Sequence, residues 1–239
     1  MKRATGLLSL VALGFLALCL VALLGARSAP AAAWTLPEVL GALTRAAPGI
    51  HSVSADATVT DYTALIAQAA KSSGHLYFER ERKGPRYVLD LTTPTDSAKK
   101  LLYTGHTAYV YTPSAHQVIR YKLGAKPGDV NAYLLLGMGA TGADLTHSFE
   151  VSLDPATTLD GQAAVELTLR PRSRSLADKL TRLDLWYDPK TWIGMQQKIW
   201  QPGGDYHLLR LTHIEVNAKL PSGVFSTSFP GASVVTPQM

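Results

Sequence analysis

Short segments that alternate apolar and polar side chains fill most of the chain from residue 51 onward. Alternation with a period of two is typical of β-strands that bury one face. Turn sequences such as Thr104-Gly105 and Asp160-Gly161 separate the segments. Links this short join antiparallel neighbours, because parallel strands require a longer crossover. The expected strands are 51–60, 74–81, 86–92, 99–104, 107–111, 117–122, 148–153, 162–169, 182–187, 193–200, 206–217 and 225–229.

Two amphipathic helices are expected beside the strands. The first begins with a capping box formed by Thr35 and Glu38. The second follows Pro127 and ends in a group of glycines that includes Gly142. The apolar side chains on one side of each helix are Leu36, Val39, Leu40 and Leu43 in the first, and Val130, Tyr133 and Leu134 in the second.

These elements together indicate an α+β fold. A dozen antiparallel strands twist too strongly to stay flat, so the sheet has to curl or close. Each helix needs an apolar surface to cover, and the concave side of a curved sheet provides one. We therefore expect a strongly curved antiparallel sheet, or unclosed β-barrel, with helices covering its concave, apolar face. The space between the two layers suits an apolar ligand.

Arg80 occupies a position where an apolar side chain is expected. In the strand 74–81, Leu76, Phe78 and Arg80 share one face. A cation directed toward buried side chains is costly unless it is paired or hydrogen-bonded. Arg80 therefore requires a partner from another element, and it is the best single clue to how the protein works.

The first 33 residues have the form of a secretory signal peptide. Lys2 and Arg3 precede an apolar run, and small residues follow it up to Ala33. The run approaches the length of about 20 residues that a membrane span needs, so an uncleaved anchor is the alternative. Cys19 is the only cysteine and follows Leu18, which does not suit lipid attachment. We expect residues 1–33 to be the leader and residues 34–239 to form a single domain without a thiol.

The charge of the chain gives little reason to expect a nucleic-acid partner. Of the 23 basic residues, three lie in the leader, which leaves 20 against 18 acidic residues and a net charge of +2 in residues 34–239. A nearly balanced domain without a dense basic run lacks the surface that binds a phosphate backbone.

Motifs for cofactors and catalysis give weak signals. Residues 137–142 match Gly-x-Gly-x-x-Gly, but a helix is expected before them and a strand after them, which is not the dinucleotide-binding context. The seven histidines lack metal-binding spacing, and no Gly-x-Ser-x-Gly elbow is present. We expect no cofactor, no metal and no enzymatic activity. A hydrolase with this sheet would need a catalytic group, and no motif in the sequence identifies one.

Four segments follow a pattern found in one known family. Residues 74–80 form a strand that ends in arginine, followed by Tyr87 and Pro94. Residues 103–113 are close to a D-G-x-x-x-W-x-Y-x-P hairpin, residues 165–171 to an L-x-P strand, and residues 217–235 to an ending with F-x-F-x-x-P-x-G-V-x-V. In this order and spacing they resemble the LolA-type outer-membrane lipoprotein carriers of the LolA/LolB superfamily. The chain departs from the pattern at Glu81, where the family has proline, and at Thr104, which replaces the hairpin aspartate.

The resemblance implies an unclosed, curved barrel lidded by helices, which carries the acyl chains of lipoproteins across the periplasm. It also implies that Arg80 hydrogen-bonds the lid helices from inside the sheet and holds the empty form closed. Carbonyls at a helix C-terminus are suitable partners for a buried guanidinium. The expected partners are lipoprotein acyl chains or other lipids, an inner-membrane lipoprotein-releasing transporter and an outer-membrane acceptor.

The function expected from the sequence is that of a periplasmic, monomeric, non-enzymatic carrier that moves lipoproteins or lipids toward the outer membrane. The alternative is a membrane-tethered, RseB-like sensor of envelope lipids or lipoproteins with the same fold, which an uncleaved leader would favour. The residues expected to line the cavity or latch its lid are Arg80, Leu76, Phe78, Tyr87, Leu36, Leu40, Leu43, Tyr133 and Leu134.

Overall fold

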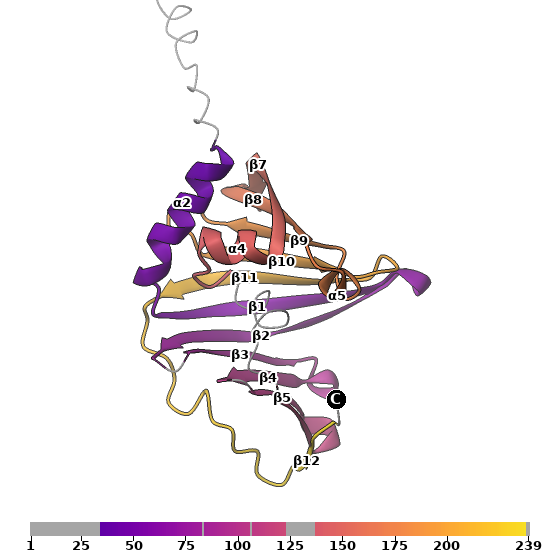
Figure 1. Cartoon of the computed structure of the whole chain (residues 1–239). Coiled ribbons are helices and arrows are strands. Elements are labelled where there is room, and N and C mark those ends of the chain that lie inside the picture. Colours follow the sequence, from indigo (N-terminus) through magenta and orange to yellow (C-terminus); the bar gives the residue numbers. More distant parts are fainter. Residues whose placement is uncertain (1–33, 83, 106, 123–136, 238–239) are drawn as a thin grey trace, which may run out of the picture. The chain divides into compact units, whose positions relative to one another are not determined.

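The protein folds around one curved, unclosed sheet (Figure 1). The computed structural model describes residues 34–82, 84–105, 107–122 and 137–237. Within these residues twelve strands are ordered β12-β6-β5-β4-β3-β2-β1-β11-β10-β9-β8-β7 across the sheet. Neighbouring strands are antiparallel except β12 and β6, which are parallel. The predicted α+β fold with an open, curved sheet is confirmed.

The element bounds are as follows. The strands are β1 (Ser52–Thr63), β2 (Gln68–Glu81), β3 (Gly84–Thr93), β4 (Lys99–Thr104), β5 (Thr107–Thr112), β6 (Gln117–Lys122), β7 (Phe149–Leu159), β8 (Gln162–Pro171), β9 (Arg182–Tyr187), β10 (Gly194–Trp200), β11 (Tyr206–Val216) and β12 (Ser233–Val235). The described α-helices are α2 (Leu36–Ala46), α4 (Gly142–Ser148) and α5 (Arg174–Ala177). Single 3₁₀ turns are η1 (Ala47–Gly49), η2 (Ala64–Ile66), η3 (Thr95–Ser97) and η4 (Pro113–Ala115).

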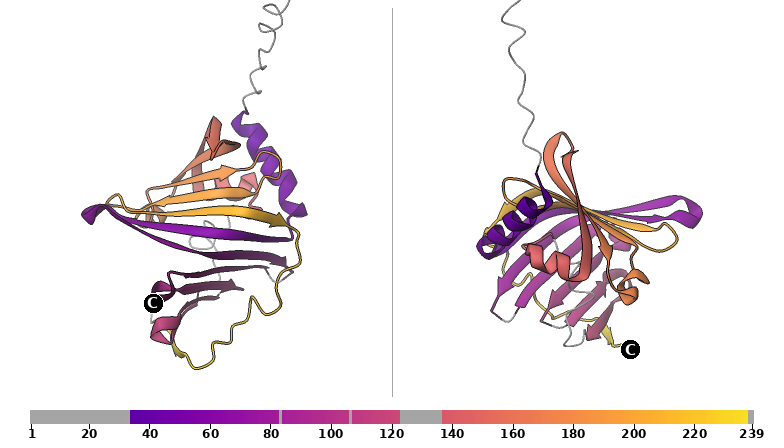
Figure 2. Two further views of the ribbon diagram at one scale, coloured as in Figure 1. Left: turned by 180° about the vertical axis from the view of Figure 1, so that it is seen from behind. Right: turned by 45° about the horizontal axis from the view of Figure 1, so that its top comes forward.

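Buried side chains on the concave side form two clusters. The α2 cluster consists of Val39, Leu43, Leu145, Phe149, Val165, Leu167, Leu169, Leu176, Leu180, Leu183, Leu185 and Tyr187. The Phe78 cluster consists of Ile50, Val53, Ala55, Ala57, Leu76, Phe78, Tyr87, Tyr103, Ala108, Met138, Ile193 and Leu211. Helices α2 and α4 lie over the half of the sheet that carries β7 to β10 (Figure 2), so the helices cover mainly the α2 cluster.

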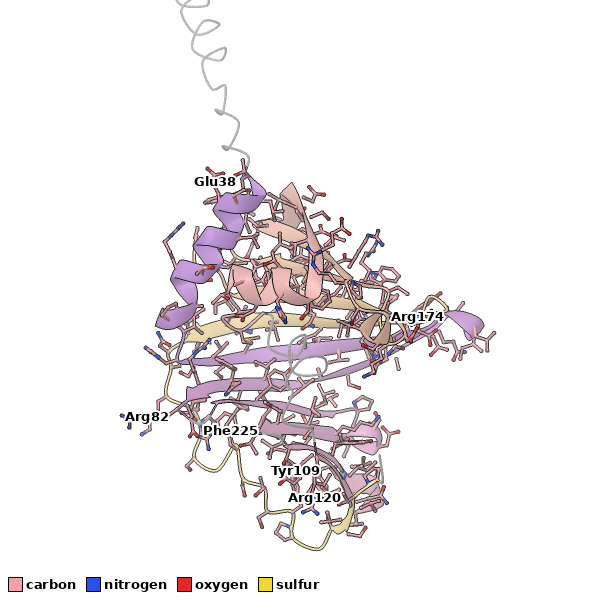
Figure 3. All side chains as sticks on the ribbon, viewed as in Figure 1. Glu38, Arg82, Tyr109, Arg120, Arg174 and Phe225 are labelled. Carbon is pink, nitrogen blue, oxygen red and sulfur yellow. The ribbon has the colours of Figure 1, made fainter. Side chains whose placement is uncertain are left out.

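Both longer helices begin with a capping box. In α2 the Glu38 carboxylate accepts hydrogen bonds from the Thr35 backbone N–H (2.8 Å) and hydroxyl (2.7 Å), and Figure 3 marks Glu38 at this end of the helix. In α4 the Asp144 carboxylate binds Thr141 in the same way. The predicted first helix is confirmed. The second predicted helix, after Pro127, lies outside the described residues up to residue 136. Gly142, predicted as one of the glycines that end it, is instead the first residue of α4.

The C-terminal segment crosses the outer, convex face of β2 to β6 before it ends in β12 (Figures 1 and 2). The Arg86 guanidinium lies 4.4 Å from the centre of the Phe225 ring, and the Phe229 ring lies 5.1 Å from that of Tyr111. The strand predicted at 225–229 is wrong, and β12 was not predicted. The rings of Phe225 and Phe229 pack against side chains of the sheet here, but residues 225–229 form no strand.

Candidate functional site

A cavity of about 400 Å³ lies on the concave side of the sheet. Its volume falls within the range of about 300–1,000 Å³ typical of ligand pockets. Most of its lining is apolar or aromatic, and it comes from β1, β3, β4, β10, β11 and the connection after α5. The lining residues are Val59, Tyr87, Leu89, Leu101, Lys179, Leu180, Gln197, Ile199, Gln201, His207 and Leu209.

The strand register gathers the apolar part of this lining. Tyr87 lies opposite Phe78 of β2, and Leu89 lies between Leu76 of β2 and Leu101 of β4. Tyr87 is 2% exposed. Burial raises the pKa of the Tyr87 hydroxyl above its ordinary value, so this side chain is neutral at physiological pH. The sheet therefore provides the cavity with an uncharged, apolar floor.

One end of the cavity is polar. The Nδ1 atom of His207 is hydrogen-bonded to the Asp61 carboxylate, and its Nε2 atom lies 3.2 Å from the Gln201 amide nitrogen. The hydrogen bond to Asp61 raises the pKa of His207 above its ordinary value, although partial burial acts in the opposite direction. Lys179, in the connection after α5, adds a cation to the same lining.

Arg80 connects β2 to two segments beside the helices. Its Nε atom donates to the Ile50 carbonyl (3.2 Å), just after η1, and its Nη2 atom donates to the Gly139 carbonyl (2.9 Å), three residues before α4. The guanidinium carbon lies 6.0 Å from the centre of the Phe78 ring. Backbone carbonyls are thus its acceptors. Arg80 itself is exposed, so the expectation of a buried guanidinium is wrong.

The glycine segment (137–142) packs its glycines against other elements. The Gly137 carbonyl accepts a hydrogen bond from the Gly194 N–H (2.8 Å), and a Cβ atom on Gly194 would lie 2.7 Å from the Gly137 Cα. A Cβ atom on Gly142 would lie 2.7 Å from the Leu40 carbonyl oxygen. Gly139 has φ +84° and faces Arg80. Close packing between β10, β2 and α2 accounts for the glycines of this motif.

The predicted site residues of the helices lie elsewhere or outside the described residues. Leu43 belongs to the α2 cluster, and Leu36 and Leu40 pack against it. In this structure these three side chains hold α2 onto the sheet and do not line the 400 Å³ cavity. Tyr133 and Leu134 are outside the described residues.

Sequence reasoning missed most of the cavity lining. Leu89, Leu101 and Leu209 follow the same alternation as Phe78, so extending the period-two pattern from strand to strand could have found them. Lys179 and Leu180 lie between α5 and β9, in a connection without a recognisable pattern. Lys179 and Leu180 line the cavity only because of the tertiary structure, so no local sequence pattern could have predicted them.

The described ranges contain neither a candidate metal cluster nor a helix that could span a membrane. No group of three or more histidine, cysteine, aspartate or glutamate side chains in these ranges could hold a metal ion. None of the helices in the same ranges is long and apolar enough to span a membrane. Residues 1–33, expected to be the leader, are outside the described part of the chain.

The open, curved sheet with helices on its concave face is a LolA-like fold, and the resemblance found in the sequence is confirmed at that level. Among solved structures, MucB aligns with a TM-score of 0.52 and 14% identity, covering 84% of this chain and 65% of MucB. An uncharacterized conserved protein from Thermus thermophilus aligns with a TM-score of 0.52 and 11% identity, covering 84% of this chain and 98% of its own.

More distant similarity extends to a LolA superfamily protein, NE2245 from Nitrosomonas europaea. It has 14% identity and a TM-score of 0.38, with 79% of this chain and 97% of that chain covered. No protein-family model and no curated protein matches the sequence. At such low identities the comparisons show the fold alone.

Proposed function

We propose that the protein is a periplasmic, non-enzymatic carrier that binds acyl chains of lipoproteins or other lipids and moves them toward the outer membrane. The observation that carries this proposal is the largely apolar cavity of about 400 Å³ on the concave face of a LolA-like sheet. Burying an acyl chain there contributes about 25 cal/mol per Å² of apolar surface removed from water. The four sequence segments that resemble lipoprotein carriers support the choice of cargo.

Arg80 would act as the latch of the ligand-free form. Its two hydrogen bonds join β2 to Ile50, after α2, and to Gly139, before α4. A ligand that separates the sheet from these segments has to break or lengthen the bonds. Ligand binding would therefore favour the open arrangement, and the strength of the bonds would set the balance between uptake and release.

The proposed cellular setting follows from the same resemblance. Residues 1–33 would direct the single domain 34–239 to the periplasm. There the protein, as a monomer, would receive its cargo from an inner-membrane lipoprotein-releasing transporter and deliver it to an outer-membrane acceptor. A retained leader, detected by sequencing the mature N-terminus, would instead favour the membrane-tethered, RseB-like sensor.

Filling the cavity tests the proposed binding site. Leu209 lines the cavity, whereas Leu208 lies on the opposite face of β11. Leu209→Trp should weaken binding of a fluorescent palmitate analogue roughly tenfold, because excluding two methylene groups costs about 0.8 kcal/mol each. Leu208→Trp is the matched control and should bind like the wild type. Equal affinities of Leu209→Trp and the wild type, together with no lipid detected by mass spectrometry of the purified protein, would reject the carrier.

A further inference from the structure

We propose that the cavity selects amphiphiles that carry one anionic head group, either a carboxylate or a phosphate. Lys179 binds this group. The inference rests on the proposed function and adds the chemical class of its ligand. It is carried by the placement of Lys179, Gln201 and His207 in a lining that is otherwise mostly apolar.

The backbone holds these polar groups at one end of the cavity. The Thr181 N–H donates to the Trp200 carbonyl (2.8 Å), which fixes the connection after α5 beside Gln201. His207 lies opposite Asp61 at the end of β11 that is nearest to this connection. Leu180 is 2% exposed and belongs to the α2 cluster. This buried neighbour anchors the backbone from which Lys179 reaches the cavity.

Lys179 places a positive charge in the lining at this end of the cavity. None of the eleven lining residues is acidic. Among the described residues, Lys179 takes part in no ion pair. An ammonium group near an apolar cavity is complementary to a ligand with an apolar chain and an anionic head.

His207 does not cancel this charge. The charged groups facing it are Asp61, which is bonded to its Nδ1 atom, and Asp205, which acts at longer range. When His207 is protonated, the His207–Asp61 pair is neutral as a whole. The Asp205 carboxylate accepts a hydrogen bond from the Ala64 N–H (2.8 Å) and is not among the lining residues, whereas Lys179 is. The Gln201 side chain beside His207 has an amide N–H that can donate to an oxyanion. Lys179 therefore supplies the charge, and Gln201 supplies a neutral donor.

Three probes with the same apolar chain test the selection. Palmitate carries a carboxylate, hexadecyl phosphate carries a phosphate, and hexadecanol carries no charge. Binding to the delipidated full-length chain is measured at neutral pH by competition with a fluorescent fatty acid, with each probe below its solubility limit or micelle concentration. Both anionic probes should bind about tenfold tighter than hexadecanol, because the Lys179 ammonium forms a hydrogen-bonded ion pair only with them.

Variants of Lys179 locate the effect. Lys179→Gln should reduce the affinity for both anionic probes to that for hexadecanol and leave hexadecanol binding unchanged. Lys179→Arg should retain the preference. Lys190→Gln is the matched control, since it removes the same charge from the turn after β9, at the other end of that strand, and it should behave like the wild type.

The outcomes separate this inference from the proposed function. If hexadecanol and palmitate bind equally well to the wild type, or if Lys179→Gln keeps the full preference for anions, the assignment of Lys179 is overturned while the acyl cavity stands. If none of the three probes binds, the proposed carrier itself is rejected. A preference for only one anionic probe identifies the head group as a carboxylate or a phosphate.

Discussion

The side chain of Arg80 lies on the apolar face of β2 and still reaches solvent. Its guanidinium carbon lies 6.0 Å from the centre of the Phe78 ring, and the guanidinium donates to two backbone carbonyls outside β2. Long cationic side chains can cover apolar surface in this way while the charged group stays hydrated. The face on which Arg80 lies follows from the alternation of Leu76 and Phe78. Its acceptors, 30 and 59 residues away in sequence, could not be predicted from any local pattern.

Replacing Arg80 tests the latch. Arg80→Leu removes both hydrogen bonds and should raise amide hydrogen exchange in residues 139–148 about tenfold, because the loss of bonds from a charged donor costs on the order of 1 kcal/mol at an exposed site. Release of a bound acyl probe should accelerate, while the circular dichroism spectrum stays the same. Arg82→Leu, two residues further along the chain, is the control. Unchanged exchange and release in Arg80→Leu would exclude the latch.

The glycine segment positions the start of α4 against α2. The Gly142 N–H donates to the Thr44 hydroxyl (3.0 Å), and Gly142 has no room for a side chain next to Leu40. The sequence contained a usable signal for α4, since Thr141 and Asp144 have the spacing of a capping box. The glycines of the same segment indicate the end of a helix, so the two local signals conflict, and the structure shows that the capping box prevails. Contact between the helices was not visible in either pattern.

Adding one methyl group tests this packing. Gly142→Ala should lower the free energy of unfolding by about 1–3 kcal/mol, because the new Cβ atom meets backbone atoms that cannot move aside easily. Gly49→Ala is the matched control, since nothing lies within 4 Å of its Cβ position, and its stability should be unchanged or slightly higher. Urea denaturation measures both. Equal stabilities of the two variants would show that α2 shifts away from the added methyl group at little cost in free energy.

For the whole molecule, β12 covers one edge of the sheet. It pairs with β6 through Ser233, Val234 and Val235, so the backbone groups on that side of β6 have a partner. Uncovered edge strands pair readily with other chains. A chain that ends at residue 232 should therefore self-associate with increasing concentration, as measured by light scattering. A chain that ends at residue 235 keeps β12 and is the control; identical behaviour of the two chains would contradict the role of β12.

The sequence contained enough information to locate the strands, but not to show which strands pair with each other in the sheet. Alternation and turns located eleven of the twelve described strands. They could not show that β1 pairs with β11, because nothing in either strand records a neighbour about 150 residues away. The lining of the cavity depends on this pairing, since Val59 of β1 and Leu209 of β11 lie opposite each other. This is why the apolar floor was only partly predicted.

The β1–β11 pairing also determines when the cavity can form during folding. Strands β2 to β6 and β7 to β10 can pair with neighbours close in sequence, but β11 has to be available before the two groups are joined through β1. Contacts between distant parts of a chain form slowly, because a large loop must close first. During synthesis, which starts at the N-terminus, strands β2 to β6 and strands β7 to β10 would therefore both expose apolar faces until residues 206–216 have been made. The cavity is therefore expected to form late, in one of the last steps of folding.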